Sequence, residues 1–496
     1  MYVTSVRSLP SIALRFRKCL TTACVAAVTA TTVPAFGQTT PAQIEAMQRQ
    51  IEALTRDLNA MKQAMAKESA DVKKELEQQP ILKIDNGRPT IRSRDGNFVA
   101  GLTGRIHFDG GGYIQEKQPL PDRRAVADLN DGTAFRRLNL GMLGTVFKDW
   151  DYVVSLDFSG GGSPEAPTLD EAYLAYMGWR PLTIRAGAFS PPQTFEDTVS
   201  SNDIVFMERP SAVSIATGVA AGSAREAAGL QYYGERWFAG AYYTGASYGT
   251  GDTTDQQAAG VGRLAGLVLK DADYNLHLGA SGSHVFRPNG GATGAAAGAR
   301  STIQLRDRPE LRIDHNRLID TGAVPSDGAH VWGLEVAANW RNLQVQGEYL
   351  GYHIDTDRLP PLASPDLDFH GYYGQVSWLI TGETRPYSIS KAAYGGVRPA
   401  RPFSLNGGGG AWELAYRYSY VNLNDKDVGG VPIATSGGVR GGEQKIHTVG
   451  VNWYVNNNVR FMLNYLHVDV DRLNAAGTTP IGDEYDAVAM RAQLSW

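Results

Sequence analysis

Apolar and polar residues alternate at every second position along most of this chain, from about residue 98 to the last residue. In one stretch, Trp332, Leu334 and Val336 alternate with Gly333 and Glu335. A period of two places one kind of side chain on each face of a β-strand. We therefore expect strands that each have an apolar face and a polar face.

The length of these alternating segments favours a membrane protein. Soluble antiparallel sheets also alternate, but a strand that crosses a membrane at a tilt needs about 10 residues and carries aromatic residues near its ends. The segment from Trp412 to Tyr420 has both features. After residue 40 the chain has no run of about 20 apolar residues, which a membrane helix would need. We therefore predict an all-β membrane barrel.

The alternation predicts about sixteen antiparallel transmembrane strands, and the even number suits closure of a bacterial barrel. Short connections alternate with long ones, as they do in outer-membrane barrels. The connection 383–409 departs from this rule, because it falls where a short turn is expected but is long and rich in Pro, Gly and Arg. The predicted strands are 98–112, 134–147, 150–159, 169–178, 181–189, 226–234, 236–244, 260–270, 273–286, 330–341, 342–353, 369–382, 410–421, 445–454, 458–470 and 484–496.

The chain stops on an aromatic residue at the end of its last predicted strand. Leu494 and Trp496 lie on the apolar face of that strand, whereas Arg491 and Gln493 lie on the polar face. Such an ending resembles the signal that the barrel assembly machinery recognises in outer-membrane proteins. We expect the apolar face to contact outer-membrane lipid and the polar face to contact water inside the barrel.

Residues 1–37 are predicted to be a signal peptide. A basic start without acidic residues precedes a moderately apolar stretch, and Ala35-Phe36-Gly37 has the form of a cleavage site. Cleavage near Gln38 would remove four positive charges and no negative ones, which changes the formal net charge from −4 to −8. It would also remove both cysteines, so the mature chain would have neither a disulfide nor a thiolate metal site. The alternative is a long uncleaved tail.

Residues 38–80 are predicted to form a coiled coil in the periplasm. An apolar stripe at spacings of three and four needs a partner to cover it, which indicates an oligomer, although a single helix lying on another domain is the alternative. A linker, 81–97, follows, and the barrel occupies 98–496. The stripe consists of Ile44, Met47, Ile51, Leu54, Leu58, Met61, Met65 and Val72.

Several segments resemble the phosphate-selective porin O and P family. They are 134–158, 372–387, 410–421 and 449–468, and VFMERP at 205–210 is similar to the constriction-loop segment of that family. The resemblance covers roughly residues 95–496. It implies a sixteen-stranded barrel in the bacterial outer membrane, a homotrimer, and a water-filled channel through which small anions such as phosphate diffuse. It also favours three helices in the coiled coil.

Arginines are the candidate anion-binding residues of such a pore, because Arg rings favour anions and guanidinium groups hold phosphate through paired hydrogen bonds. Each could instead pair with a lumen acid such as Glu335 or Glu413. Loop 287–329 holds five more arginines that could form a basic funnel. The candidates are Arg137, Arg185, Arg417 and Arg491, which face the lumen by alternation, Arg209 in the loop 190–225, and Arg225 where that loop rejoins the wall.

The loop 190–225, which is the natural candidate for narrowing the pore, argues against strong anion selectivity. It contains no lysine, whereas the resemblance implies lysines near the constriction. A net acidic constriction would weaken or reverse an anion preference, so we expect anion passage with modest selectivity. The alternatives are a general or weakly cation-selective porin, and a plugged barrel that tethers the membrane. The acids of the loop are Glu196, Asp197, Asp203 and Glu208.

The sequence offers no sign of catalysis or of a bound cofactor. None of the nine histidines has a metal-ligand spacing such as HExxH or HxH, and no GxSxG or Walker motif is present. We expect no enzyme activity, no cofactor, no metal and no nucleic-acid partner.

Deletion of Trp496 should impair barrel assembly, because it removes the aromatic end of the last strand. Arg491→Ala should leave assembly intact, because Arg491 lies on the opposite face. The measurement is the amount of heat-modifiable, folded protein in outer-membrane fractions. Wild-type levels of the chain that lacks Trp496 would contradict this prediction.

Overall fold

The structure is a computed structural model, and it describes residues 40–85, 87–115, 128–159, 167–222, 224–249, 255–289, 301–357 and 365–496. The predicted signal peptide, 1–37, lies outside the described residues. The chain divides into two units, Met1–Glu77 and Gln78–Trp496.

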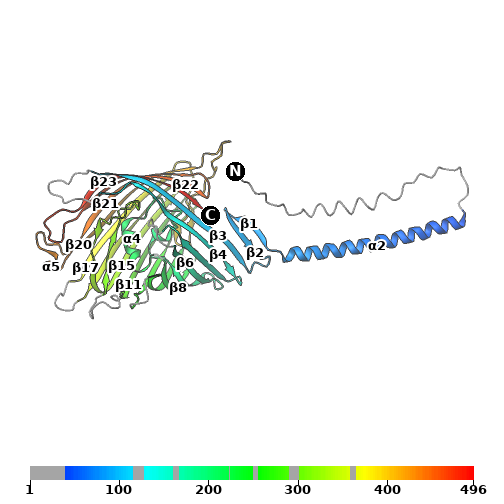
Figure 1. The fold of residues 1–496 in the computed structure, drawn as a ribbon, viewed down its shortest axis with the longest axis horizontal. Helices are drawn as coiled ribbons and strands as arrows, with labels where there is room; N and C mark the ends of the chain where they lie inside the picture. The colour runs from blue at the N-terminus through cyan, green and yellow to red at the C-terminus, as the bar shows by residue number, and fades with distance from the viewer. Residues whose placement is uncertain are drawn as a thin grey trace. The chain divides into compact units, whose positions relative to one another are not determined.

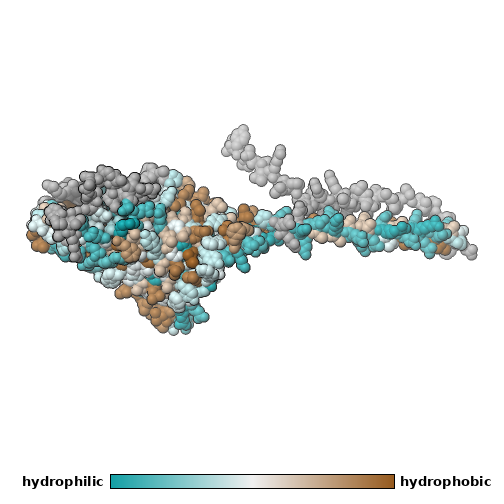
Figure 2. Space-filling model, turned by 90° about the horizontal axis from the view of Figure 1, so that it is seen from below, coloured by the Kyte–Doolittle hydropathy of each residue, from teal (hydrophilic) through white to brown (hydrophobic). Residues whose placement is uncertain are grey.

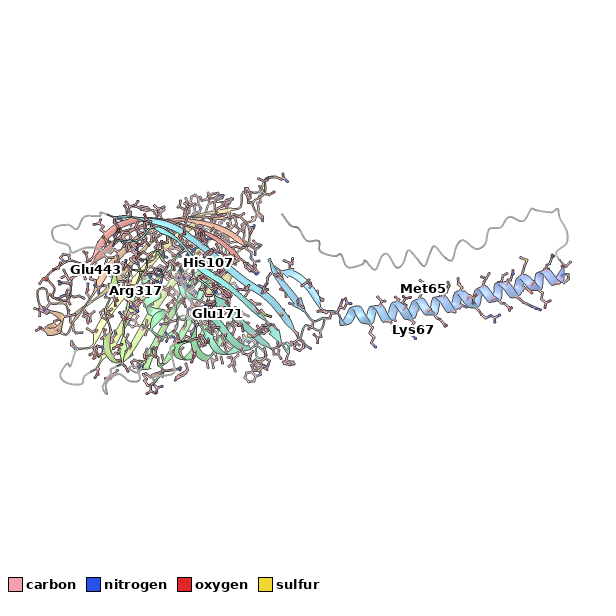
Figure 3. All side chains as sticks on the ribbon, viewed as in Figure 1. Met65, Lys67, His107, Glu171, Arg317 and Glu443 are labelled. Carbon is pink, nitrogen blue, oxygen red and sulfur yellow. The ribbon has the colours of Figure 1, made fainter. Side chains whose placement is uncertain are left out.

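The described part of the first unit is one long helix, α2 (Pro41–Gln78), as expected from the stripe. Proline suits the start of a helix because its missing N–H has no intrahelical partner there. All apolar residues of the stripe are exposed in the single chain, with Leu54 the most open at 67%. Met65 and Lys67 project from this helix in Figure 3. Exposure of a continuous apolar stripe to water is unfavourable, so a helix of this kind needs another surface to cover the stripe.

The second unit is a closed antiparallel barrel of sixteen strands, which confirms the predicted fold class. Each strand pairs with the next along the chain, and the last pairs with the first, from Tyr485↔Gln115 to Ser495↔Arg105. The strands are β3 (Val99–Gln115), β4 (Gly132–Val146), β5 (Trp150–Asp157), β6 (Thr168–Tyr176), β7 (Leu182–Phe189), β8 (Arg225–Tyr233), β9 (Trp237–Ser247), β10 (Ala258–Lys270), β11 (Tyr274–Arg287), β15 (Val324–Trp340), β16 (Leu343–Thr356), β17 (Leu367–Leu379), β20 (Ala411–Asp425), β21 (Val439–Tyr454), β22 (Val459–Asp471) and β23 (Asp483–Ser495).

Part of the segment expected to be a linker, 81–97, pairs with the barrel. Its two short strands, β1 (Ile81–Asp85) and β2 (Arg88–Arg92), form a hairpin. β2 then pairs with β3 from Thr90↔Gly101 to Arg92↔Val99. β2 thus extends the edge of β3 just beyond the point where β23 ends, because β23 pairs only with residues from Arg105 onward.

Short turns lie at one end of the barrel and long connections at the other (Figure 1). The segment between β17 and β20 is the exception that the sequence indicated. The connections contain short elements, namely α3 (Phe195–Thr198), α4 (Ser211–Ala220), β12 (Thr302–Ile303), β13 (Arg306–Asp307), β14 (Ile319–Asp320), β18 (Tyr387–Ser388), β19 (Ala393–Tyr394) and α5 (Ile433–Ser436).

The burial pattern of the barrel is the reverse of that in a soluble protein. On β20, Trp412 and Leu414 are exposed on the outer face, while Glu413 and Arg417 are buried inside. Figure 2 shows hydrophobic side chains, in brown, gathered on the outer surface of the barrel strands. An apolar outer band around a polar interior is typical of a barrel that sits in lipid. Among the described residues, no helix is long and apolar enough to cross a membrane.

Candidate functional site

The loop between β7 and β8, residues 190–224 and here called the inward loop, crosses the barrel lumen. Lumen side chains of the opposite wall hold its backbone. Arg460 on β22 donates to the carbonyls of Ile204 and Val205 at 2.7 and 2.9 Å. Arg417 on β20 donates to the carbonyl of Glu208 at 2.9 Å. The loop therefore narrows the lumen, as its length predicted.

Helix α4 anchors the second half of the inward loop. Its small and apolar residues are mostly buried, and it packs on β16, β17 and β20. Tyr352 donates to the carbonyl of Ala212 at 2.7 Å. At the other end, Arg225 donates to the carbonyl of Gly218 at 3.0 Å, which suits the negative end of a helix. Arg225 is 5% exposed and thus holds the helix rather than facing open water.

A second segment, residues 301–323, enters the lumen from the same end of the barrel. The Glu310 carboxylate accepts hydrogen bonds from Arg417 and Ser419 on β20 and from the backbone N–H of Ser211 in the inward loop. Arg312 pairs with Asp307 at 3.0 Å. The segment includes Arg308 and Arg312, two of the five arginines that were predicted to form a basic funnel, and their partners differ. Arg312 is mostly buried in ion pairs, whereas Arg308 forms a hydrogen bond with His315.

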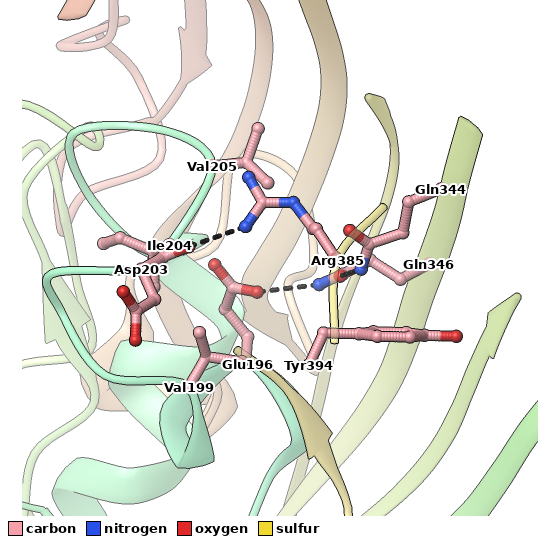
Figure 4. Close-up of a pocket in the computed structure, with 9 residues that line it drawn as sticks. All are labelled: Glu196, Val199, Asp203, Ile204, Val205, Gln344, Gln346, Arg385 and Tyr394. Carbon is pink, nitrogen blue, oxygen red and sulfur yellow. Dashed lines mark hydrogen bonds between the residues drawn. The ribbon is translucent and has the colours of Figure 1, made fainter. Parts of the chain in front are cut away.

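The long connection between β17 and β20, residues 380–410, enters the lumen from the short-turn end. Arg385 pairs with Glu413 at 2.8 Å and donates to the carbonyl of Asp203 in the inward loop at 3.1 Å. Where the two segments meet, they line a small pocket beside β16, in which Gln346 donates to Glu196 at 2.7 Å (Figure 4). The exceptional length of this connection thus supplies a third inward segment.

Glu208 of the inward loop lies at the centre of a cluster of arginines. Arg136 binds it through two hydrogen bonds of 2.6 and 3.0 Å. Arg491 approaches it at 3.0 Å and Arg312 at 3.7 Å. Burial alone would raise the pKa of the Glu208 carboxyl, but the surrounding guanidinium groups hold that pKa well below its usual range. The surrounding guanidinium groups therefore favour the charged form of this carboxylate.

Arg136 was not predicted to face the lumen, because strict alternation places it on the lipid face. A β-bulge between β3 and β4 leaves Arg136 without a partner, since His107 pairs with Arg137 and Phe108 pairs with Phe135. The side chains of two consecutive arginines can then lie on the lumen side, while Phe135 stays exposed on the outer face. Bulges redirect side chains in this way. A second bulge frees Asp170 on β6, which pairs with Arg105 at 2.7 Å.

The other acids of the inward loop differ in their surroundings. Asp197 lies 3.4 Å from Arg209, which additionally donates to the carbonyls of Glu196 and Val199. Burial raises the pKa of the Glu196 carboxyl and that of the Asp203 carboxyl above their usual values. A count of charges within the loop therefore overstates how acidic the constriction is, because wall arginines contribute to it.

The predicted pore arginines separate into two groups. Arg209, Arg225, Arg417 and Arg491 are occupied by carboxylates or loop carbonyls. Among the described residues, Arg137 and Arg185 form no ion pair with a carboxylate. Arg185 lies over the ring of Tyr173, with 4.5 Å between the guanidinium carbon and the ring centroid. One terminal nitrogen of Arg137 is buried without a hydrogen-bond partner. These two thus differ from Arg209, Arg417 and Arg491 in having no carboxylate within ion-pair distance in the described part of the chain.

Comparison with known proteins identifies the family. The family model described as phosphate-selective porin O and P matches residues 101–496. The chain belongs to this family. It is an outer-membrane porin with a channel through its barrel.

Two known proteins illustrate the relationship. Porin O of Pseudomonas aeruginosa is 27% identical over 417 residues, which cover 81% of this chain and 92% of that protein. A solved structure titled anion-selective porin from Comamonas acidovorans is 13% identical, with a TM-score of 0.48, and covers 80% of this chain and 100% of that one.

Arg491→Ala should loosen the inward loop without preventing barrel assembly. It removes the 2.6 Å ion pair with Asp109 and the hydrogen bond to the carbonyl of Met207. Loss of one partner from a buried ion pair costs about 3–5 kcal/mol. The backbone hydrogen bonds between the strands remain, so we expect the inward loop to be destabilised and the barrel to stay folded. We expect larger and noisier single-channel conductance in planar bilayers.

The matched control is Arg341→Ala, which removes an exposed arginine at a short turn. The control channel should behave like the wild type. Conductance of Arg491→Ala that equals the control would show that Arg491 does not hold the loop.

Proposed function

We propose that the channel conducts small anions, including phosphate, with modest selectivity over cations. The observation that carries the proposal is the pair of lumen arginines, Arg137 and Arg185, that have no carboxylate within ion-pair distance among the described residues. Uncompensated arginines in a narrowed, water-filled lumen attract anions and exclude cations.

Arginine also suits phosphate as a solute. Its planar guanidinium can donate two parallel hydrogen bonds to phosphate oxygens, and it stays charged at any physiological pH. Modest selectivity fits the composition of the inward loop, which has acids and no lysine. The description of the family as phosphate-selective agrees with the proposed solute.

Replacing Arg137 and Arg185 together with Gln should shift the channel toward cations. Gln retains hydrogen-bonding capacity but removes the positive charge. A change in ion selectivity can therefore be attributed to the lost charge. The measurement is the reversal potential of purified protein in planar bilayers across a potassium chloride gradient. We expect a modest chloride preference for the wild type and a loss of about half or more of the reversal potential for the double variant.

A double variant with Arg341→Gln and Arg180→Gln is the control, because both arginines are exposed near short turns. It should keep the wild-type reversal potential. A wild-type channel that prefers potassium would overturn the anion proposal.

We further propose that the porin is a trimer whose α2 helices form a periplasmic coiled coil. The exposed stripe of α2 requires a covering surface, and a second copy of the same stripe provides one. The chain enters the barrel through β1 and β2 at the short-turn end. In outer-membrane barrels that end faces the periplasm.

Leu54→Lys combined with Met61→Lys should lower the temperature at which the trimer dissociates. Both residues lie in the stripe seven positions apart, so the two lysines would place like charges in the helix interface. Ala53→Lys combined with Ala60→Lys is the control, because it adds the same charge at the same spacing outside the stripe. Dissociation is followed by gel mobility of the full-length protein after graded heating. Equal dissociation temperatures for the two double variants would contradict the coiled coil.

A further inference from the structure

Three side chains that can bind a metal ion converge on the outer face of the barrel near its long-loop end. His330 on β15 lies directly opposite His353 on β16, and Asp355 follows two residues later on the same face. His330 has the same orientation as Trp332, Leu334 and Val336, which are exposed toward lipid. The cluster is thus separate from the lumen. We call His330, His353 and Asp355 the outer histidine site.

The distances within this site match a small, four-coordinate metal ion. His330 Nε2 lies 3.5 Å from one oxygen of Asp355, and His353 Nε2 lies 3.4 Å from the other. The ligand atoms of all three residues lie within 4.8 Å of one another. Tetrahedral zinc with bonds of about 2.0–2.1 Å places neighbouring ligand atoms roughly 3.3 Å apart. Small rotations of the side chains would therefore complete the coordination.

Surrounding residues orient both imidazole rings for metal binding. His353 Nδ1 lies 2.7 Å from Asp368, so the carboxylate fixes the proton on Nδ1 and leaves Nε2 free to bind a metal. His330 Nδ1 lies 2.6 Å from His284 Nδ1, and the two rings are stacked. Metal-binding histidines commonly donate their second ring N–H to a carboxylate or another acceptor. Both candidate ligands already have such a partner.

We propose that the outer histidine site binds one divalent transition-metal ion of the zinc class per chain. Two imidazoles and one carboxylate are donors that zinc accepts, and three protein ligands leave a fourth position for water. All three residues are half-buried. They lie on the outer face, so a metal ion can reach them without passing through the pore. A bound ion would link β15 to β16 beside the long loops. The proposal is independent of the solute that the channel conducts.

Metal titration of the purified full-length protein in detergent tests the proposal. Zinc should bind with a stoichiometry of one per chain by calorimetry, and cobalt should give the visible absorption bands of tetrahedral coordination. Asp355→Asn, which preserves side-chain shape, and His353→Ala should each weaken zinc binding by at least tenfold. Asp368→Asn should weaken it by about 10–100-fold, because the orienting carboxylate is lost.

The control is His447→Ala, which removes another outward-facing histidine from a separate cluster with His467 on β21 and β22. It should bind zinc like the wild type. Heat-modifiable gel mobility checks that each variant is folded. The proposal is overturned if the folded wild type binds no stoichiometric zinc, or if Asp355→Asn and His353→Ala bind it with wild-type affinity. Loss of binding in His447→Ala alone would likewise overturn it, since the ion would then occupy the other cluster.

Discussion

The hydrogen bonds that join β23 to β3 close the barrel, and the rest of the structure depends on that closure. Lipid offers no partner for a backbone N–H or C=O, so an open strand edge would be costly at every residue. The register from Tyr485↔Gln115 to Ser495↔Arg105 pairs this edge. Trp496 continues the pairing, because its backbone N and O both bond to Gly104. The ladder also fixes which face each side chain takes.

Closure directs polar side chains from every strand into one enclosed space. Those side chains need partners, and the three inward segments bring backbone carbonyls that supply them. A guanidinium has five N–H donors, so a single arginine can balance a carboxylate and hold a loop. Arg385 does this with Glu413 and Asp203, and Arg491 with Asp109 and Met207. The narrowing of the lumen and the balance of its charges therefore depend on the same residues.

The outer face follows the same ladder with a different result. Strand register places side chains that are distant in sequence directly beside one another. His284, His330 and His353 become neighbours on three successive strands in this way. In the apolar band the neighbours are aliphatic and aromatic, as in the exposed row of Trp332, Leu334 and Val336. Near the long loops they are imidazoles and carboxylates, which makes the outer histidine site possible.

The sequence by itself determined the number, spacing and direction of the strands, because a period of two is a local property that survives in any antiparallel sheet. It also located the long inward loop, the exceptional connection before β20 and the apolar stripe of α2. The sequence did not reveal which groups the lumen arginines contact. Arg417, Arg491 and Arg225 look alike in sequence to Arg137 and Arg185, but only the folded chain shows which of them meet carboxylates or carbonyls. The bulge at Arg136 and the meeting of His330 with Asp355 were likewise decided by tertiary structure, since both depend on the register between strands and not on any spacing within one strand.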